Sequence, residues 1–212
     1  MRRVKDLLEI ETSAPCLDSA VEMGLEKFGC SRAEVVVDVL QAPSRGVFGL
    51  FGVRPARARI RLVDASCIAR RVTEHLLLLA GLQASVHVEG VGEGIELLIS
   101  GEDTRLVIGR HGQTLDALQS LVSTLTDRVV PERTRITLDA EGYRKRRAVS
   151  IARLVRRLVG QVRRSGRPAT LRPMPAGERE IVHRLVREEP GIEVRSIGPG
   201  PERKMILARR KD

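Results

Sequence analysis

The order of apolar and polar residues divides the first third of the chain into one helix and two strands. Pro15–Phe28 predicts a helix that ends at a glycine. Glu34–Leu40 is rich in valine, and Pro55–Leu62 alternates small or apolar residues with arginine, so both segments predict strands. A glycine-rich run at 43–52 lies between them. The pattern predicts a small α+β module over residues 1–62.

The middle third, residues 63–140, predicts two strands followed by two helices, with a further helix before them and a strand after them. In chain order these elements are a helix from Asp64 to Ala80, strands Ser85–Glu89 and Ile95–Ser100, a short helix Asp103–Ile108, a longer helix ending near Asp127, and a strand Arg133–Leu138. A tetrapeptide with glycine at both ends separates the short helix from the longer one. The segment therefore predicts a second α+β module.

The last third, residues 141–212, begins with a long predicted helix, Glu141–Arg164. One of its faces is apolar and consists of Ile151, Val155, Leu158, Val159 and Val162. Arginines separated by seven, four and seven residues form a stripe along another face: Arg146, Arg153, Arg157 and Arg164. A second helix is predicted from Pro175 to Arg187, and closing strands are predicted at Ile192–Ile197 and Glu202–Ala208.

The distribution of charge adds a functional hint to this outline. The 212 residues are 42% apolar and 30% charged, which is typical of a folded globular chain. The net charge of +10 is uneven, with +2 over residues 1–63, −4 over 64–140 and +12 over 141–212. A basic excess confined to one segment indicates a module that binds a polyanion, and nucleic acid is the favoured ligand.

Aromatic residues are too scarce for one common mode of nucleic-acid binding. The chain has one Tyr, three Phe and no Trp, whereas proteins that stack bases on aromatic platforms need several rings on one surface. A nucleic acid would therefore be held by its backbone. The predominance of Arg over Lys suits paired phosphate contacts, although genomic base composition explains it equally well.

Several kinds of chemistry find no support in the sequence. Cys16, Cys30 and Cys67 have no metal-ligand spacing and an odd count, so we expect reduced, buried thiols in a cytoplasmic protein. The longest strongly apolar stretch, Leu76–Leu82, is too short to span a bilayer, and no signal peptide is recognisable. Catalytic serine, phosphate-loop and zinc motifs are lacking, so we expect no enzyme, no cofactor and no metal.

The tetrapeptide Gly109-Arg110-His111-Gly112 is the strongest candidate for a binding site. Glycines permit positive φ and the close approach of another backbone. The helix that follows presents N–H groups to a phosphate, as in domains that clamp about four nucleotides of a single strand. The RNA-binding residues expected here are Gly109, Arg110, His111, Gly112, Gln113 and Thr114. The G-x-x-G tetrapeptides that begin at Gly46 and Gly49 are expected to form packed turns instead.

A second candidate surface lies on the helix predicted from Pro175. Arg179, His183 and Arg187 are four residues apart and share one face of that helix. Arginine offers a paired donor to phosphate, and histidine adds a hydrogen bond or a charge. The alternative interpretation is that His183 is packed and the two arginines are only solvated.

Four segments resemble a known family. Leu106–Gln119 is similar to a KH domain in the prokaryotic, type II arrangement, and Ser44–Gly52 is similar to a glycine-rich N-terminal signature. Asp139–Arg144 resembles the junction that follows the KH domain, and Met174–His183 resembles the start of an R3H domain, named for an Arg and a His separated by three residues. Together they resemble the Jag family, also called SpoIIIJ-associated or KhpB/EloR-like proteins.

The resemblance implies an α+β fold of three small modules: a Jag N-terminal domain over 1–62, a KH domain over 63–140 and an R3H domain over 141–212. It implies single-stranded RNA as ligand and a role in post-transcriptional regulation linked to the cell envelope, cell wall organisation, cell shape or division. It also implies a homodimer or a heterodimer with a small KH-only protein.

Two alternatives stay open at this point. The first is a protein-interaction adaptor or chaperone-like partner of the membrane insertion or division machinery. Phe48, Leu50 and Phe51 of the nearly neutral first module favour it, because an exposed apolar group there would suit a protein partner. The second is single-stranded DNA as ligand, since only contacts to the 2′-hydroxyl distinguish RNA from DNA.

Overall fold

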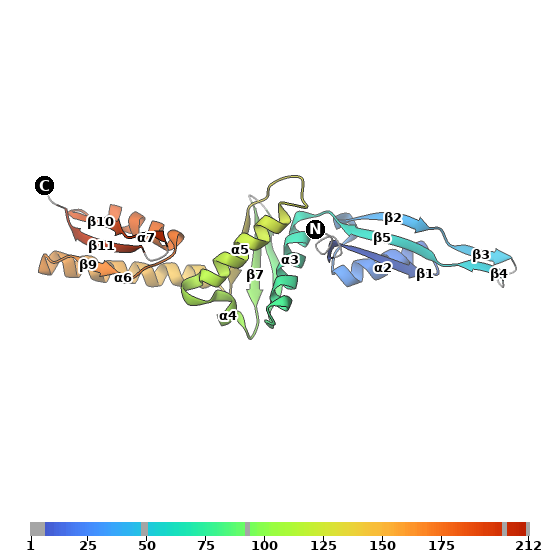
Figure 1. Cartoon of the computed structure of the whole chain (residues 1–212), viewed down its shortest axis with the longest axis horizontal. Coiled ribbons are helices and arrows are strands. Elements are labelled where there is room, and N and C mark those ends of the chain that lie inside the picture. The colour runs from blue at the N-terminus through green and yellow to red at the C-terminus, as the bar shows by residue number, and fades with distance from the viewer. Residues whose placement is uncertain (1–6, 48–50, 92–93, 201–202, 211–212) are drawn as a thin grey trace. The chain divides into compact units, whose positions relative to one another are not determined.

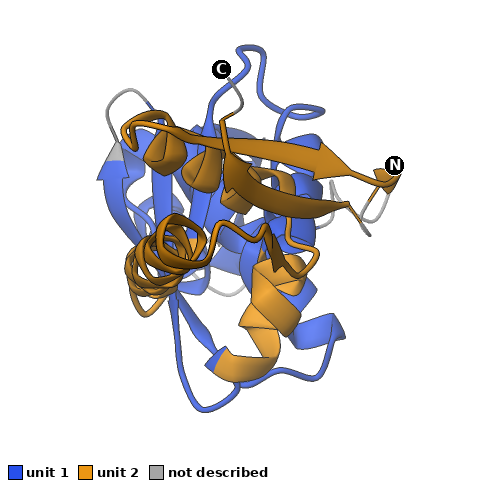
Figure 2. Ribbon diagram, turned by 90° about the vertical axis from the view of Figure 1, so that its left-hand side faces the viewer, with its two compact units in different colours: residues 1–104, 116–138 blue, residues 105–115, 139–212 orange. Residues whose placement is uncertain are grey.

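Figure 1 shows a computed structural model of the chain, which describes residues 7–47, 51–91, 94–200 and 203–210. The chain forms two compact units, drawn in two colours in Figure 2. The first consists of residues 1–104 and 116–138, and the second consists of residues 105–115 and 139–212. The described residues form three three-stranded sheets and one two-stranded sheet beside the helices, which confirms the α+β class.

The N-terminal module packs one helix on one sheet. Its elements are β1 (Glu9–Ala14), α2 (Leu17–Phe28), β2 (Val35–Gln41), β3 (Ser44–Val47), β4 (Phe51–Arg54) and β5 (Ala56–Leu62). The sheet has the order β1-β5-β2 with antiparallel pairs, and β3 and β4 form a separate hairpin. The predicted alternation in β5 is confirmed, because Ala56, Ala58 and Ile60 are buried while the arginines between them are accessible.

The arginines on the accessible face of β5 are all paired with carboxylates of its two neighbours. The register places Arg61 opposite Glu9 and places Arg59 opposite Glu11 and Asp38, whereas Arg57 lies opposite Ser13 and Gln41 and reaches Glu11 diagonally. The N···O distances are 2.8–3.0 Å in these cross-strand ion pairs, which join Arg57 to Glu11, Arg59 to Glu9 and Glu11, and Arg61 to Asp38. The stripe of positive charge visible in the sequence is therefore matched, residue by residue, by negative charge.

The next elements follow the order expected for a KH domain. They are α3 (Ala65–Leu79), β6 (Ser85–Val91), β7 (Ile95–Ser100), α4 (Thr104–Ile108), α5 (Gln113–Thr126) and β8 (Ile136–Ala140), with the sheet order β6-β7-β8. Apolar residues of α3 and of the sheet are buried, among them Ile68, Val72, Ile95, Leu97 and Ile99. The amide side chain of Gln119 in α5 accepts a hydrogen bond from the Leu138 N–H at 3.0 Å, which ties the helix to β8.

The last elements enclose a second core. They are α6 (Tyr143–Ser165), β9 (Ala169–Leu171), α7 (Ala176–Arg187), β10 (Ile192–Ile197) and β11 (Lys204–Arg209), with the sheet order β10-β11-β9. The helix α6 ends where Gly166 takes a left-handed conformation and donates its N–H to the carbonyl of Val162. The core is formed by one face of α6, the inner face of α7 and the sheet, and includes Ile151, Val155, Val159, Val182, Val186, Met205 and Leu207.

The sequence predicts none of the strands β1, β3, β4 and β9. Of these, β1 is mostly polar, and its six residues are held by antiparallel pairing with β5. Strand β9 has only three residues and pairs with β11. Such strands depend on partners distant in sequence, so local periodicity does not reveal them. Strand β8 is also shifted, because it begins at Ile136 and not at Arg133.

The cysteine expectation needs a correction. All three cysteines are free, but only Cys67 is buried, while Cys30 is half-buried and Cys16 is exposed. Cys16 precedes α2, and its Sγ accepts a hydrogen bond from the Ser19 N–H at 3.5 Å, so it acts as the N-cap. The prediction of a buried thiol is therefore wrong at that position.

Some predictions fall on side chains that the structure leaves out. An exposed apolar group was expected at Phe48, Leu50 and Phe51, and the side chains of these residues lie outside the described ones. Glu202, the predicted first residue of the last strand, also lies outside the described residues. Among the helices within the described ranges, none is both long enough and apolar enough to cross a membrane.

Candidate nucleic-acid interface

The loop between α4 and α5 has an unusual backbone. Three of its four residues have positive φ: Gly109 at 69°, His111 at 54° and Gly112 at 79°. Positive φ is costly for a residue with a side chain, so His111 is held in this conformation by its surroundings. The loop thus has a defined shape, in which Arg110 is exposed and His111 is half-buried.

Both glycines of the loop are required by close packing within the protein. A Cβ at Gly109 would lie 2.0 Å from Oγ1 and 2.7 Å from Cβ of Thr114. A Cβ at Gly112 would lie 2.9 Å from Cε1 of Tyr143. Carbon atoms do not approach this closely, so a larger residue at either position would displace the loop or its neighbour. The loop is therefore fitted against the first residue of α6.

Arg147 of α6 joins the loop to α7. Its Nε and Nη2 donate to Oε1 and Oε2 of Glu178 at 2.6 and 2.9 Å, and Nη2 lies 3.2 Å from Nδ1 of His111. A guanidinium only donates, so Nδ1 accepts and the ring proton is carried by Nε2. The side chain of Arg147 is 26% exposed and that of Glu178 is 10% exposed. The hydrogen bonds that Arg147 donates to Glu178 raise the pKa of Arg147, with burial opposing them.

This arrangement can present a phosphate-binding group while keeping the loop fixed. Within the described part of the chain, Arg110 forms no ion pair with a carboxylate. Arg110 is accordingly open to an anionic ligand, while His111 is oriented by Arg147. Gln113 and Thr114 are exposed at the start of α5, where the N–H of Gln113 donates to the carbonyl of Arg110. Of the six residues expected from the sequence, Arg110, Gln113 and Thr114 are thus exposed, Gly109 and His111 are half-buried, and Gly112 is buried.

Comparison with protein families identifies the three modules. A model of the Jag N-terminus matches residues 12–62, a model of the KhpA/KhpB KH domain matches residues 72–138, and a model of the R3H domain matches residues 149–209. The order agrees with the fold described above. The chain belongs to the Jag family.

Relatives of this Jag-family chain share nearly its whole length. It is 28% identical to RNA-binding protein KhpB of Bacillus subtilis (strain 168) over 198 residues, which cover 92% of this chain and 95% of the relative. It is 26% identical to RNA-binding protein KhpB of Clostridium symbiosum over 208 residues, which cover 96% of this chain and 92% of the relative.

The three predicted residues on α7 of the R3H domain differ in their surroundings. Arg179 is half-buried, and its Nη1 donates to the carbonyl of Met174 at 2.8 Å. His183 is exposed, with Nε2 3.5 Å from Oγ of Ser196, and Arg187 is exposed as well. Arg179 therefore supports the segment before α7, whereas His183 and Arg187 face the solvent.

Three residues of this site carry no clear signal in the sequence pattern: Tyr143, Arg147 and Glu178. Tyr143 lies in the segment that resembles the junction after the KH domain, so the signal for it was a motif without an assigned role. Arg147 is one of several basic residues at the start of α6, and Glu178 is one of several charged residues on α7. Nothing in the spacing of residues 31 positions apart marks them as partners.

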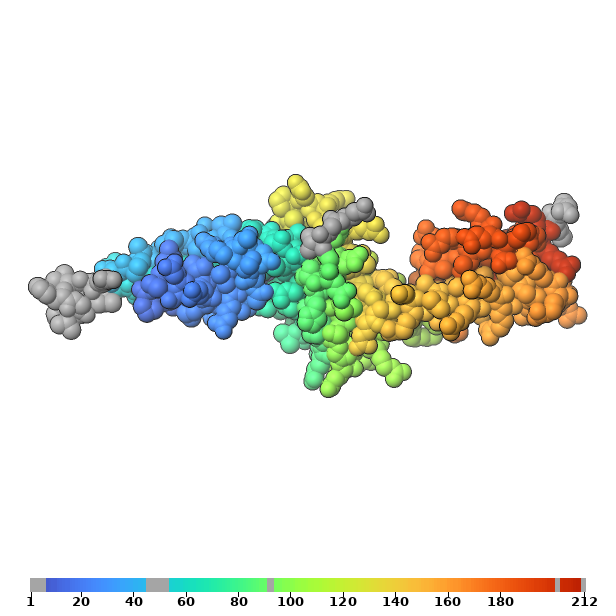
Figure 3. Space-filling model, turned by 180° about the vertical axis from the view of Figure 1, so that it is seen from behind, coloured from blue at the N-terminus to red at the C-terminus, as the bar shows by residue number. Residues whose placement is uncertain are grey.

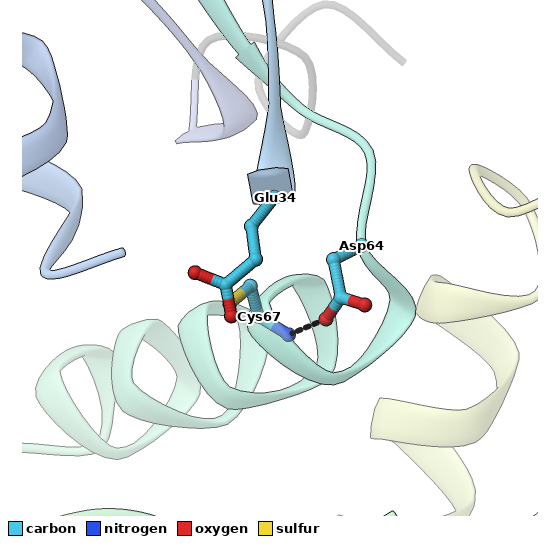
Figure 4. A group of neighbouring side chains, drawn as sticks. All are labelled: Glu34, Asp64 and Cys67. Carbon is cyan, nitrogen blue, oxygen red and sulfur yellow. Dashed lines mark hydrogen bonds between the residues drawn. The ribbon is translucent and has the colours of Figure 1, made fainter. Parts of the chain in front are cut away.

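Glu34, Asp64 and Cys67 gather where the N-terminal module meets α3 (Figure 4). Their oxygen and sulfur atoms lie within 4.8 Å of one another. Asp64 accepts hydrogen bonds from the N–H groups of Ser66 and Cys67 at 2.9 and 3.0 Å, which makes it the N-cap of α3. Glu34 accepts from the N–H of Ser31.

The protonation of this group follows from these bonds. Burial opposes ionisation of Asp64, but hydrogen bonds from Ser66 and Cys67 lower its pKa. Burial, together with a hydrogen bond to Glu34, raises the pKa of the Cys67 thiol to about 12, so it stays protonated at neutral pH. A cysteine binds a metal ion as a thiolate, but the Cys67 thiol is protonated, and both carboxylates already accept hydrogen bonds from helix N–H groups. Helix capping therefore explains why the three side chains gather here.

Proposed function

We propose that this Jag-family protein binds single-stranded RNA through the loop at residues 109–112. The observation that carries the proposal is a loop of defined shape that exposes Arg110 without a carboxylate partner in the described residues. A backbone clamp of this kind needs no aromatic platform, which agrees with the scarcity of aromatic residues. The names of the relatives support RNA as ligand. The same names favour a binding function over catalysis, and we propose that this binding requires no cofactor.

The test reverses the charge of the loop. We expect Arg110→Asp to weaken binding of a single-stranded oligouridine by about tenfold or more, because a carboxylate would face the clamped phosphate. The matched control is Arg133→Asp, which makes the same charge change at another exposed arginine. Fluorescence anisotropy gives the affinities, and circular dichroism verifies the fold. Equal affinities of the two variants would refute the clamp.

The variant is limited to Arg110 for a structural reason. Replacing His111 with aspartate would place a carboxylate beside Arg147 and form a new ion pair inside the protein. Such a variant would combine a change in ligand contacts with a change in loop anchoring. Arg110 has no comparable role, so its substitution reports on the ligand.

We propose a secondary contribution from α7, in which His183 and Arg187 contact phosphates and Arg179 maintains the preceding segment. Alanine substitutions of these residues are expected to change different measured quantities. Arg187→Ala would flatten the dependence of log K on log salt by about 0.7, as for one lost single-strand contact. Arg179→Ala would mainly lower the denaturation midpoint, because it removes the bond to the Met174 carbonyl.

We also propose the wider role implied by the family: post-transcriptional regulation in the cytoplasm, linked to the cell envelope or division. The dimer implied by the family has one supporting observation, since Leu78 and Leu79 at the end of α3 are 73% and 70% exposed. Exposed leucines suit a protein partner, such as a second copy of the chain or a KH-only protein. Light scattering of Leu78→Ser/Leu79→Ser tests this, with loss of a dimer expected.

A further inference from the structure

The arginines of α6 form a straight line on the solvent side of the helix. At about 100° per residue, positions separated by seven, four and seven residues deviate by no more than about 20° from one line. The line consists of Arg146, Arg153, Arg157 and Arg164, and all four side chains are exposed. Buried Ile151, Val155 and Val162 lie on the opposite face, in the core. We call these four residues the α6 stripe.

The charges of the α6 stripe are not neutralised. In the described part of the chain, Arg153, Arg157 and Arg164 have no carboxylate oxygen within ion-pair distance, and Arg146 donates to the backbone carbonyl of Glu141. Arg163, on a different side of the helix, is in contrast paired with Glu189 at 2.9 Å. The space-filling view shows α6 as a continuous run of surface, from yellow to orange (Figure 3). The stripe is therefore an open line of positive charge.

The α6 stripe starts at the loop. Tyr143, the first residue of α6, packs against Gly112, and Arg147 contacts His111. Arg146 comes three residues after Tyr143 and one before Arg147, so the stripe begins within one helical turn of the residues that hold the loop. At about 1.5 Å per residue, the stripe then extends over about 27 Å. Loop and stripe belong to the same compact unit.

We propose that α6 is a second phosphate-binding track, along which the α6 stripe holds the RNA backbone beyond the nucleotides clamped by the loop. The proposal rests on the proposed function of the loop and extends it. A clamp of about four nucleotides followed by about four arginine contacts gives a site of about eight to ten nucleotides. Arginine contacts to phosphate carry no sequence information, so the track adds affinity without adding base preference.

RNA fits this surface better than an anionic membrane does. A helix that lies in a membrane interface exposes bulky apolar residues beside its basic ones. Most bulky apolar residues of α6 pack in the core, including buried Ile151 and Val155. Val149 is 45% exposed, and α6 has no Trp or Phe. Positions 150 and 160, which fall along the α6 stripe, are serine and glycine. The stripe thus offers four charges with few bulky apolar side chains beside them, which suits a phosphate backbone.

The experiment compares RNA lengths on four full-length proteins: wild type, the stripe variant Arg153→Gln/Arg157→Gln/Arg164→Gln, the sheet control Arg57→Gln/Arg59→Gln/Arg61→Gln, and the loop variant Arg110→Asp. Oligouridines of five and twelve nucleotides serve as probes in anisotropy titrations at several salt concentrations. The control removes the same formal charge as the stripe variant. Circular dichroism and thermal melts establish that each variant is folded.

We expect wild type to bind the twelve-nucleotide RNA more tightly than the five-nucleotide RNA. The stripe variant should lose most of that gain in affinity, about tenfold or more. The slope of log K against log salt concentration for the longer RNA should become shallower by about 2, at about 0.7 for each of three lost contacts. Its affinity for the five-nucleotide RNA should stay within about twofold of wild type, because the loop is intact. The sheet control should resemble wild type for both RNAs.

The outcomes separate the track from the loop. If the stripe variant equals wild type on the longer RNA while the loop variant fails to bind, the track is refuted and the loop function stands. If wild type binds neither RNA, both are refuted. Binding of the same proteins to vesicles containing phosphatidylglycerol tests the membrane alternative. If the stripe variant loses vesicle binding but keeps the salt slope for RNA, the stripe belongs to a membrane contact and the track is overturned.

Discussion

Two lines of arginine in this protein have opposite environments. On β5, Arg57, Arg59 and Arg61 each contact a carboxylate of a neighbouring strand, at N···O distances of 2.8–3.0 Å. On α6, Arg153 and Arg157 are exposed, and within the described residues no carboxylate lies at ion-pair distance from them. Both lines are visible in the sequence as regular spacing of the same residue type.

The difference teaches that spacing alone does not identify a binding surface. A strand in the middle of a sheet has neighbours on both sides, so every exposed side chain has cross-strand partners. The outer face of a helix at the edge of a module has only its own i±3 and i±4 neighbours. A positive stripe on a central strand is thus readily neutralised, whereas one on an outer helix face stays available for an anionic ligand.

Arg147 sharpens the comparison, because it is a paired and partly buried arginine on the same helix as the α6 stripe. Arg147→Met would leave the carboxylate of Glu178, a residue that is 8% exposed, without its partner. We expect a loss of about 2–3 kcal/mol in the free energy of unfolding, less than for a fully buried pair because Arg147 is partly exposed. Chemical denaturation of the full chain measures it.

The control for this variant is Arg156→Met, the same substitution at an exposed position of α6. It should change the free energy of unfolding by no more than about 0.5 kcal/mol. Arg147→Met should also weaken RNA binding, since His111 loses its contact. If both variants had the same stability, pairing with Glu178 would contribute nothing to the fold.

Gly112 tests whether the start of α6 shapes the loop. Gly112→Ala introduces a Cβ 2.9 Å from Tyr143 Cε1 at a φ of 79°, so we expect a loss of about 1–2 kcal/mol and weaker RNA binding. Tyr143→Leu removes the ring atoms nearest to that Cβ. In a double-mutant cycle, Gly112→Ala should therefore cost less in the Tyr143→Leu background. An equal cost in both backgrounds would assign the whole effect to backbone conformation.

Asp64 is a charge balanced by backbone N–H groups instead of by an arginine. Asp64→Ala should cost about 1 kcal/mol at neutral pH, because it removes the N-cap of α3. The native pKa of Asp64 is lowered, so this stabilisation is complete above the unfolded pKa and disappears as the pH falls through the lower native pKa. The stability difference between wild type and Asp64→Ala should therefore shrink in acid. Asp64→Asn should keep most of the cap at neutral pH.

The sheet arginines offer a way to reverse the comparison. Glu9→Gln/Glu11→Gln/Asp38→Asn would remove the carboxylates that neutralise β5 and leave three arginines about 6.8 Å apart along the strand. We expect about a twofold to threefold gain in affinity for oligouridine and a steeper salt dependence. Unchanged affinity would show that position, and not pairing, separates the two lines.

Local pattern was sufficient for most of the element order. Alternation in Pro55–Leu62 and helical spacing in Glu141–Arg164 predicted β5 and α6 within two residues at each end. The ends of α2 and α6 were predicted because Gly29 and Gly166 adopt left-handed conformations that other residues resist. The loop between α4 and α5 was predicted for the same reason, and so were its candidate ligand-binding residues. These features depend on residues adjacent in sequence.

Only the tertiary structure decided which charges are satisfied. Arg57 and Glu11 are 46 positions apart, and Arg147 and Glu178 are 31 positions apart, so no local period connects them. The same holds for the contact of Tyr143 with Gly112 and for the hydrogen bond from Arg179 to the Met174 carbonyl. Periodicity encodes which face of an element is buried, whereas ion pairs depend on how distant elements meet. The open charge of the α6 stripe is therefore a property of the fold.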